Sequence, residues 1–423
     1  MASFTLARLT PGSPETGIWH SATFMVQGYV AHRLAPMGNP RHSASSGAGS
    51  LAQAIDATAG DLYRALGAAG TNSVFSPASI AIALQMALRG ARGETASELA
   101  RFLHLTPEVA GGDALRLLSA DLAGAAREHL TFRMPNTMWV QSGLSLLPEF
   151  TAWINQVAAA DVADADFIHE AEKARQEINR IIAEQTENKI EDLIAPGVVH
   201  EDTRLVLANA VYLKAPWAHT FAEQATDDAP FHLDGGGTAR VPMMRQTAQF
   251  GYCRGDGYQA VVLPYAGERL AMAVVLPDGR LATLADRLAT TGLRDVLAAA
   301  RRTQLRLALP RFRLQTQIQL KATLRQLGVV RAFSADDADF SGITTEEFLY
   351  IDEVVHKAYI DVDEHGTEAA AATAVVLRML AAFSPAEPPV TVTVDRPFLF
   401  AIVDTASWVP LFLGNVMNPA ARA

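Results

Sequence analysis

Cysteine is almost absent from the sequence, since Cys253 is the only one among 423 residues. An internal disulfide framework is therefore excluded, although the compartment stays open because many secreted proteins also lack disulfides. No apolar run approaches the roughly 18 residues that a membrane span requires. The formal charge of −10 comes without any run of lysine or arginine, so neither a nucleic-acid groove nor an anionic membrane surface is indicated as a partner.

The first fifty residues lack the order of basic and then apolar residues that marks a secretion signal. Polar residues such as His20, Gln27 and Arg33 interrupt every candidate apolar core. The chain as written is therefore predicted to be cytoplasmic by default, with an extracellular location still open. The Ser/Gly/Pro-rich stretch 36–50 is predicted to be a flexible extension, and the true start could lie within it.

Apolar residues recur at helical spacing in the first half of the chain. With 49% hydrophobic and 19% charged residues, the composition is that of a soluble globular protein with a substantial core. Ser76 followed by Pro77 is typical of a helix start, and Thr95 is predicted to cap another helix. Helices are predicted over residues 51–66, 77–89, 95–103, 149–160 and 169–187.

Strand-like segments dominate the second half of the chain. Helices come first and strands later, without regular alternation. This order predicts an α+β protein built on a large mixed sheet. The predicted strands cover residues 204–213, 260–263, 271–276, 304–309, 354–362 and 391–394.

Templates for catalytic and metal sites find little support. The phosphate loop GxxxxGK[ST] and the GxSxG elbow are both missing from the sequence. His169-Glu170 and His200-Glu201 each lack the second histidine that a zinc-protease helix requires. The three glycines at 235–237 favour a hairpin turn over a phosphate loop. A Ser/His/Asp triad stays open as an alternative, because triads are defined by geometry and not by chain order.

The stretch EHGTEAAAATAVVLRML, residues 364–380, consists largely of small uncharged residues. Such a segment suits either a solvated loop or a strand that slides into a sheet. Gly366 supplies a backbone hinge, because glycine rotates freely through positive φ. An alanine-rich helix is the alternative, although a strand-like run before the segment and prolines after it bracket a loop. In an extended chain one face would carry Thr367, Ala369, Ala371 and Thr373, and the other Glu368, Ala370 and Ala372.

Several long motifs stand in the order found in the serpins, and the chain resembles that family from about Leu51 to Pro419. VTVDRPFLFAI looks like the serpin signature, NSVFSPASIAIALQMALRGARGET looks like the second-helix block, and EHGTEAAAAT looks like the hinge of the reactive-centre loop. ANAVYLKAPW, LPRF and VVHKAYIDVDE fit as well. The resemblance implies one domain over residues 51–423 after an extension at 1–50. It also implies three β-sheets, eight or nine helices and an exposed reactive-centre loop at about 364–389.

The resemblance implies a protease inhibitor and not an enzyme. In inhibitory serpins a serine protease attacks the loop, forms the acyl-enzyme and is carried across the molecule as the loop inserts into the central sheet. Hydrolysis never finishes, so the inhibitor is consumed in one turnover. The family pattern implies a monomer with no cofactor and no metal. The alternative is a non-inhibitory serpin that acts as a binder, carrier or chaperone, and the small residues at 367–373 favour the inhibitor.

The resemblance also places the reactive bond. The cleaved residue of inhibitory serpins lies fourteen positions beyond the hinge glycine, which is Leu380 here, followed by Ala381. Leucine implies chymotrypsin-like, elastase-like or cathepsin G-like proteases as partners. A papain-like cysteine protease stays open as a partner. A shifted register would move the bond to Arg378, Met379 or Phe383 and change the target.

Three groups of residues match serpin positions that work in loop insertion, none of them catalytic. The hinge is matched by Glu364, Gly366, Thr367, Glu368, Ala369, Ala370, Ala371, Ala372 and Thr373. The shutter, a polar cluster beneath the point where the central strands part, is matched by Ser76, Ser79, Asn209 and His356. The breach, where the loop first enters, is matched by Trp217, Arg311 and Glu364, the last two as an expected ion pair. Outside the resemblance, these residues would be a buried hydrogen-bond network and ordinary surface charges.

Overall fold

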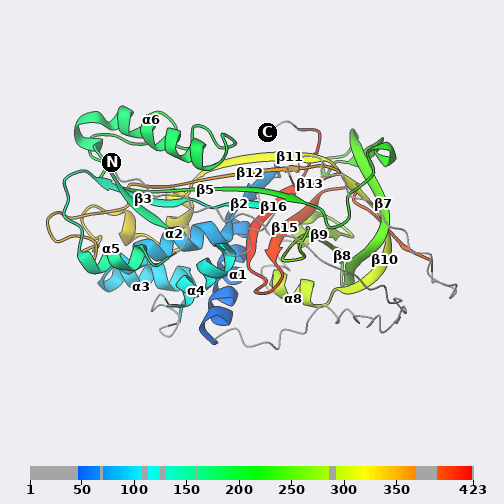
Figure 1. Cartoon of the computed structure of the whole chain (residues 1–423), viewed down its shortest axis with the longest axis horizontal. Helices are drawn as coiled ribbons and strands as arrows, with labels where there is room; N and C mark the ends of the chain where they lie inside the picture. Colours follow the sequence, from blue (N-terminus) through cyan, green and yellow to red (C-terminus); the bar gives the residue numbers. More distant parts are fainter. Residues whose placement is uncertain are drawn as a thin grey trace, which may run out of the picture. The chain divides into compact units, whose positions relative to one another are not determined.

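A computed structural model of the protein describes residues 46–66, 70–106, 113–123, 130–157, 160–284, 292–367 and 388–421 (Figure 1). No helix among these residues is long and apolar enough to cross a membrane. The helices are α1 (Ser46–Leu66), α2 (Pro77–Gly90), α3 (Gly93–Phe102), α4 (Asp113–Ala123), α5 (Pro148–Ile154), α6 (Phe167–Gln185), α8 (Leu293–Ala298) and α9 (Lys321–Gln326). Two short 3₁₀ turns, η2 (Glu223–Ala225) and η3 (Arg331–Phe333), complete the helical elements.

Among the described residues, seven strands form a mixed sheet in the order β11, β12, β13, β5, β3, β4, with β2 paired to β5. Its central strand β5 reads LVLANAVYLKAP and is buried along nearly its whole length, as expected for a strand covered on both faces. The strands are β2 (Thr131–Arg133), β3 (Asn136–Gln141), β4 (Asp161–Ala165), β5 (Leu205–Pro216), β11 (Phe312–Gln319), β12 (Glu353–Val362) and β13 (Gly366–Thr367).

The second sheet follows the order β1, β16, β15, β9, β8, β7, β10, β14, with β6 paired to β7. Strand β7 is 18 residues long and pairs with β6, β8 and β10. Of the three sheets expected from the resemblance, two are therefore joined into one by the hydrogen bonds of this strand. The strands are β1 (Ser73–Phe75), β6 (Asp227–His232), β7 (Thr238–Gly255), β8 (Tyr258–Pro264), β9 (Leu270–Pro277), β10 (Arg301–Pro310), β14 (Val390–Thr393), β15 (Phe398–Asp404) and β16 (Pro410–Val416).

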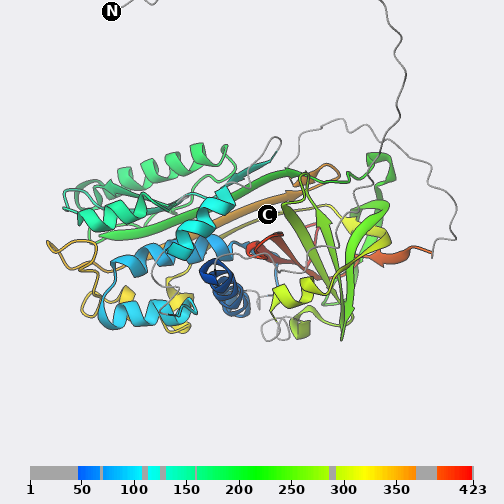
Figure 2. The same cartoon turned by 60° about the horizontal axis from the view of Figure 1, so that its bottom comes forward.

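Helices cover both faces of the sheet that contains β5 and β12 (Figures 1 and 2). Helix α2 packs against β3 and β5 on one face and is buried on nearly all sides, which explains its apolar sequence. Helix α6 lies along the other face, where Phe167 and Ile178 pack with Val206 and Val355 of the sheet. The strands that matter for function thus run between two helical layers.

The predicted α+β class with a large mixed sheet is confirmed. The predicted hairpin at the glycine cluster is confirmed too, since β6 and β7 pair on either side of it, with positive φ at Gly236 and Gly237. The predicted cap at Thr95 is wrong, because α3 already begins at Gly93. The Thr95 side chain is buried, and its hydroxyl accepts a hydrogen bond from the backbone N–H of Asp339 at 3.0 Å. Helix α1 also begins within the predicted extension.

Candidate functional site

Strands β5 and β12 are parallel neighbours in the middle of their sheet. Their register runs from Val206 opposite Glu353 to Tyr212 opposite Tyr359. Beyond Tyr212 and Tyr359 the two strands no longer pair with each other. The short strand β13 lies between them at this end, antiparallel to both. The sheet is thus open at one end of the β5/β12 pair.

Strand β13 is held by its second residue. Thr367 pairs with Ala215 of β5 and with Val362 of β12, and its side chain is fully buried. The Thr367 hydroxyl lies 2.6 Å from the hydroxyl of Tyr265, which is also fully buried. Either hydroxyl can donate the hydrogen bond to the other, so neither polar group is buried without a partner. The segment predicted as an exposed loop therefore begins inside the sheet.

Gly366 makes the close approach of β13 to β5 possible. It has a φ of 154°, and a Cβ added there would stand 2.1 Å from the carbonyl oxygen of Ala215. No side chain fits at that distance. Glycine is therefore required at this position by the space as well as by the backbone angle.

Glu364 and Arg311 form an ion pair at the open end of the β5/β12 pair. The guanidinium donates a hydrogen bond from Nε to one carboxylate oxygen at 2.8 Å, and its Nη2 lies 2.6 Å from the same oxygen. Thr226 donates a further hydrogen bond to the same oxygen. Glu364 is 1% exposed. Burial alone would raise the pKa of its carboxyl, but the hydrogen bonds from Arg311 and Thr226 outweigh burial and lower it.

Trp217 lies beside this ion pair and holds the turn before β13. Its indole N–H donates to the carbonyl of Asp363 at 2.9 Å, and its ring stacks on Tyr265 with 4.6 Å between centroids. The Asp363 carboxylate accepts hydrogen bonds from the backbone N–H groups of His365 and Gly366. The matched residues Trp217, Arg311 and Glu364 thus meet around one turn.

The four residues matched to the shutter also meet, where β5 and β12 pack on the start of α2. The ring of His356 accepts a hydrogen bond from the backbone N–H of Ser76 at 3.0 Å through Nε2. Its Nδ1 donates to the side-chain oxygen of Asn209, the residue directly opposite on β5. The Ser76 hydroxyl accepts from the backbone N–H of Ser79 and thereby caps α2. All four residues are fully buried.

His356 is neutral in this arrangement. Complete burial lowers the pKa of the imidazole to about 3. The backbone N–H of Ser76 can only donate, which requires an unprotonated Nε2 and leaves the single ring proton on Nδ1. Among the described residues, the side-chain N–H₂ of Asn209 has no hydrogen-bond partner. The cluster therefore keeps unused hydrogen-bonding capacity at the contact between the two strands.

Sequence reasoning missed several residues of this region. Asn136 of β3 accepts a hydrogen bond from the Ser79 hydroxyl at 2.7 Å, and Tyr265, Asp363 and Thr226 bind the hinge and the ion pair. For Asp363 a signal existed, because an aspartate before a glycine often bonds the backbone two residues on. The other three are far from their partners in the chain, and nothing local marks them.

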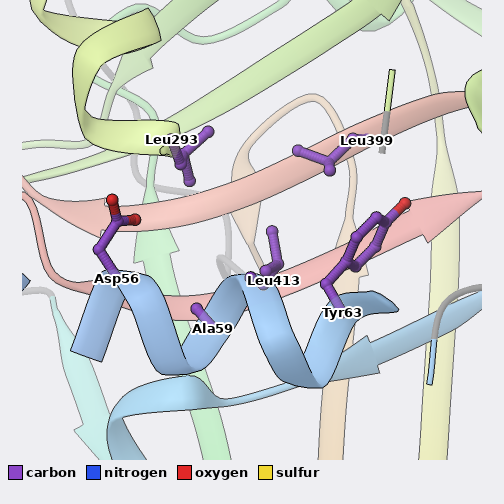
Figure 3. Close-up of a pocket in the computed structure, with 7 residues that line it drawn as sticks. Asp56, Ala59, Tyr63, Leu293, Leu399 and Leu413 are labelled. Carbon is purple, nitrogen blue, oxygen red and sulfur yellow. The ribbon is translucent and has the colours of Figure 1, made fainter. Parts of the chain in front are cut away.

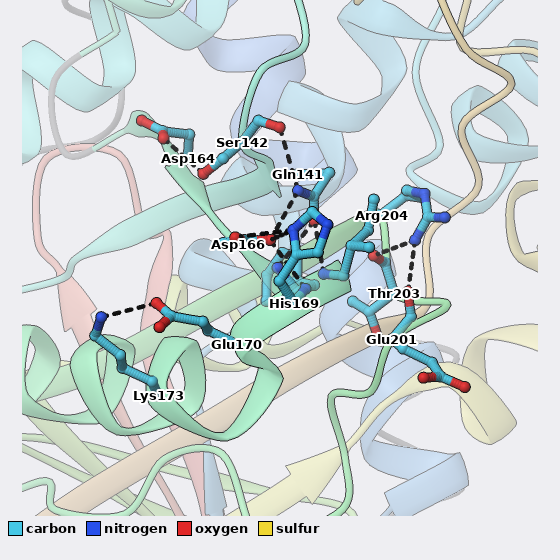
Figure 4. Close-up of polar contacts among 12 residues, drawn as sticks. Gln141, Ser142, Asp164, Asp166, His169, Glu170, Lys173, Glu201, Thr203 and Arg204 are labelled. Carbon is cyan, nitrogen blue, oxygen red and sulfur yellow. Dashed lines mark hydrogen bonds and ion pairs between the residues drawn. The ribbon is translucent and has the colours of Figure 1, made fainter.

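The two His-Glu pairs tested as metal motifs lie elsewhere. His169 stands in the first turn of α6, where Asp166 caps the helix by accepting from the His169 backbone N–H at 3.1 Å (Figure 4). The side-chain oxygen of Gln141 accepts hydrogen bonds from the backbone N–H groups of Phe167 and Ile168 at the same helix start. Within the described ranges, no group of three or more His, Cys, Asp or Glu could hold a metal ion. His169 belongs to a helix cap.

The remaining predicted positions lie outside the described residues. They are the hinge residues Glu368, Ala369, Ala370, Ala371, Ala372 and Thr373, the reactive bond Leu380 and Ala381, and the alternatives Arg378, Met379 and Phe383.

Comparisons with known proteins agree with this geometry. The family model "Serpin (serine protease inhibitor)" matches residues 53–419. An uncharacterized serpin-like protein of Thermococcus kodakarensis is 39% identical over 87% of this chain and 86% of its own. Leukocyte elastase inhibitor A of Mus musculus is 36% identical over 82% of this chain and 93% of its own. The crystal structure of Tengpin, a thermophilic serpin, in the native state superposes with a TM-score of 0.77 at 27% identity, over 87% of this chain and 94% of that one. The chain belongs to the serpin family, whose members are mostly protease inhibitors and not enzymes.

Proposed function

We propose that this serpin is a suicide inhibitor of chymotrypsin-like or elastase-like serine proteases, cleaved between Leu380 and Ala381. The observation that carries the proposal is the position of β13 between β5 and β12. Strand β13 already lies between two parallel strands and is antiparallel to both. Further residues of the same segment could extend this strand between β5 and β12, and we call this path the β5/β12 track. The segment that follows β13 in the chain is the one of small residues.

The register of β13 predicts where the following residues would lie after insertion. Thr367 faces Ala215 and Val362, so Thr373, six positions further, would face Asn209 and His356. Strands stand about 4.8 Å apart, so an inserted strand would separate Asn209 from His356 by about one further strand spacing. The Thr373 hydroxyl would arrive where their hydrogen bond had been. This fit supports a shutter role for the two residues.

The same register gives the length of the movement. Leu380 lies thirteen residues beyond Thr367, which is about 43 Å of extended strand. In register it would pass the ends of both strands, since β5 begins at Leu205 and β12 at Glu353. A protease bound covalently to Leu380 would thus be carried along the full β5/β12 pair.

Insertion is favourable because it exchanges one strand interface for two. If about ten additional backbone hydrogen bonds form at ~1 kcal/mol net each, the gain is on the order of 10 kcal/mol. A catalytic group displaced by ~1 Å loses about 10²-fold in rate. A fraction of the insertion energy, spent on distorting the protease, would therefore stop deacylation.

The protease class rests on two supports. Leucine at the cleaved position suits a medium-sized or large apolar specificity pocket. The relatives named leukocyte elastase inhibitor share about a third of their residues with this chain. Both supports favour chymotrypsin-like, elastase-like or cathepsin G-like targets.

The binder alternative gains nothing from the pocket that lies between α1, α8, β15 and β16 (Figure 3). The pocket is lined mainly by apolar side chains, with Asp56 and Tyr63 at its edges. Its volume is about 20 Å³, which suffices for one water molecule. A carried small molecule would not fit there, although thyroxine-binding globulin is among the similar solved structures.

The proposal is tested by incubation with chymotrypsin and with an elastase, followed by a denaturing gel and mass determination of the released peptide. A boiling-resistant complex together with a peptide that starts at Ala381 is expected. Cleavage with full protease activity remaining would count against trapping by that protease. A thermal scan of the cleaved protein then decides about insertion, since an inserted loop raises the unfolding temperature strongly. Cleavage without any such rise would contradict the proposal.

A further inference from the structure

The outward face of strands β7, β10 and β14 contains a groove of about 290 Å³. The three strands lie side by side in the second sheet, with β14 at its edge. Two rows of residues cross them: one contains Thr247, Arg306 and Thr391, and the next contains Arg245, Ala308 and Thr393. We call this the β7/β10/β14 groove.

The hollow arises from the alternation of side-chain size in the second row. Ala308 stands between Arg245 and Thr393, so the middle of the row has only a methyl group. The longer side chains on either side form the walls. Arg306, Thr247 and Thr391 are exposed, which shows that the face is open to solvent. The groove is therefore polar, walled and accessible.

The charge of the groove is positive on a chain whose net charge is −10. Arg245 pairs with Asp227 at 2.8 Å, and this pair is largely solvent-exposed. Arg306 has no ion-pair or hydrogen-bond partner for its guanidinium among the described residues. An exposed arginine beside three threonine hydroxyls offers a fork of donors that matches a carboxylate.

The position of the groove relative to the reactive bond follows from the chain. Strand β14 begins at Val390, ten residues after Leu380. Ten extended residues span at most about 36 Å, comparable with the diameter of a small domain. A protease that holds Leu380 in its active site is therefore within reach of the groove.

We infer that the β7/β10/β14 groove is a docking site for an acidic loop at the active-site rim of the attacking protease, with Arg306 as the carboxylate-binding residue. The inference rests on the proposed function and adds a determinant of protease choice beyond Leu380. Charges at the rim of an interface act mainly on the association rate and its salt dependence. The groove therefore selects among proteases that all accept leucine, by the charge they bring to β10.

The test compares Arg306→Glu with Arg325→Glu as the matched control. Arg325 is an exposed arginine on α9, a helix that packs on α1, so its replacement changes the net charge equally at a distant place. The probes are two leucine-cleaving serine proteases, one with an acidic active-site rim and one with a basic rim. The measured quantity is the second-order rate constant for loop cleavage at several salt concentrations. It reports the encounter whether the protease is then trapped or released.

For the acidic-rimmed protease, Arg306→Glu is expected to lower the rate constant about three- to tenfold at low salt, and for the basic-rimmed protease to raise it. Arg325→Glu is expected to change neither by more than about twofold. A second variant, Ala308→Leu, fills the hollow without changing charge and is expected to slow only the acidic-rimmed protease. Equal effects of Arg306→Glu and Arg325→Glu would overturn the inference.

The outcome separates the two proposals. If the wild-type protein is cleaved without forming a boiling-resistant complex, the proposed inhibition fails. The rate constants for loop cleavage of the variants still decide whether the groove binds the protease. If complexes form and the three variants match the wild type, only the groove is refuted. A wild-type dimer in light scattering that Arg306→Glu dissolves would assign the groove to a second copy of this chain and overturn the inference as well.

Discussion

His356 of β12 and Asn209 of β5 stand directly opposite each other in the parallel register and are joined by a side-chain hydrogen bond. Any strand that enters between β5 and β12 must break this bond. The contact therefore couples the separation of the two strands to the hydrogen bonding and protonation of one buried imidazole. Through Ser76, the same imidazole is bonded to the start of α2, beneath the sheet.

The first prediction concerns pH. The folded-state pKa of His356 is about 3, below the ordinary value of 6.5, so the unfolded chain binds the extra proton between these values. Stability is then fully present above about pH 6.5 and is lost as the pH falls, by up to about 1.4 kcal/mol per pH unit. At pH 5 the loss should be about 2 kcal/mol, measured by urea unfolding at pH 7.5 and pH 5.

The control for this prediction is His356→Gln, which should flatten the dependence between pH 7.5 and pH 5. His219→Gln, at an exposed position outside the shutter, is the matched control. Burial raises the pKa values of Glu353 and Asp363, so these carboxyls increase the stability as the pH falls, opposite to His356. Their contribution is the same in the wild type and in the variants. If the unfolding free energy changed equally with pH in the wild type and in His356→Gln, the imidazole would not cause the pH dependence.

The second prediction concerns the hinge glycine. Replacing Gly366 by alanine places a methyl group 2.1 Å from the carbonyl oxygen of Ala215, so β13 must leave its place between the strands. The hydrogen bond between Thr367 and Tyr265 would be lost, and the ring stack of Trp217 on Tyr265 would become exposed. We expect a loss of about 1–3 kcal/mol in unfolding free energy and a changed tryptophan fluorescence.

The matched control for the glycine variant is Gly279→Ala, where a Cβ meets nothing within 4 Å and the backbone angle is ordinary. It should change stability by less than about 0.5 kcal/mol. If Gly366→Ala were equally silent, β13 would not be held in the sheet in solution.

Part of this site could be predicted from the sequence. The largely apolar sequence of β5 and the helix start at Ser76 and Pro77 were readable from local pattern alone. The pairing of Arg311 with Glu364 came from matched motifs, since 53 residues separate them and no local rule connects them. The contact between Tyr265 and Thr367, 102 residues apart, exists only because β13 enters the sheet, and composition does not reveal such a meeting.

Strand β7 was missed for a different reason. A half-buried strand is recognised by strict alternation, but here the exposed side switches at Met243 and Met244, which are both buried. Pro242 just before this switch also argues against a strand in sequence terms. Because the buried side changes along β7, the strand can pair with β6 at one end, with β10 along its middle and with β8 at the other end. A search for a single two-residue alternation therefore misses it.

The third prediction concerns the ion pair. Arg311→Ala would leave the carboxylate of Glu364, which is 1% exposed, with Thr226 as its remaining side-chain donor. Because Arg311 itself is 43% exposed, the expected cost is moderate, about 1–2 kcal/mol in unfolding free energy at pH 7.5. The loss should shrink in Arg311→Ala/Glu364→Gln, where no buried charge is left. A double variant no more stable than the single one would mean that the pair does not hold the turn.

The fourth prediction tests insertion itself. Thr367 is fully buried between β5 and β12, with its hydroxyl against that of Tyr265. Thr367→Arg would have to bury an unpaired guanidinium to enter the sheet, so insertion should be blocked while cleavage at Leu380 continues. The variant is expected to behave as a substrate, with a many-fold higher ratio of inhibitor consumed to protease inhibited. Glu368→Arg is the matched control, because in an extended chain the next residue points to the opposite face and should still allow trapping. If Thr367→Arg formed a boiling-resistant complex as readily as the control, inhibition would not proceed through the β5/β12 track.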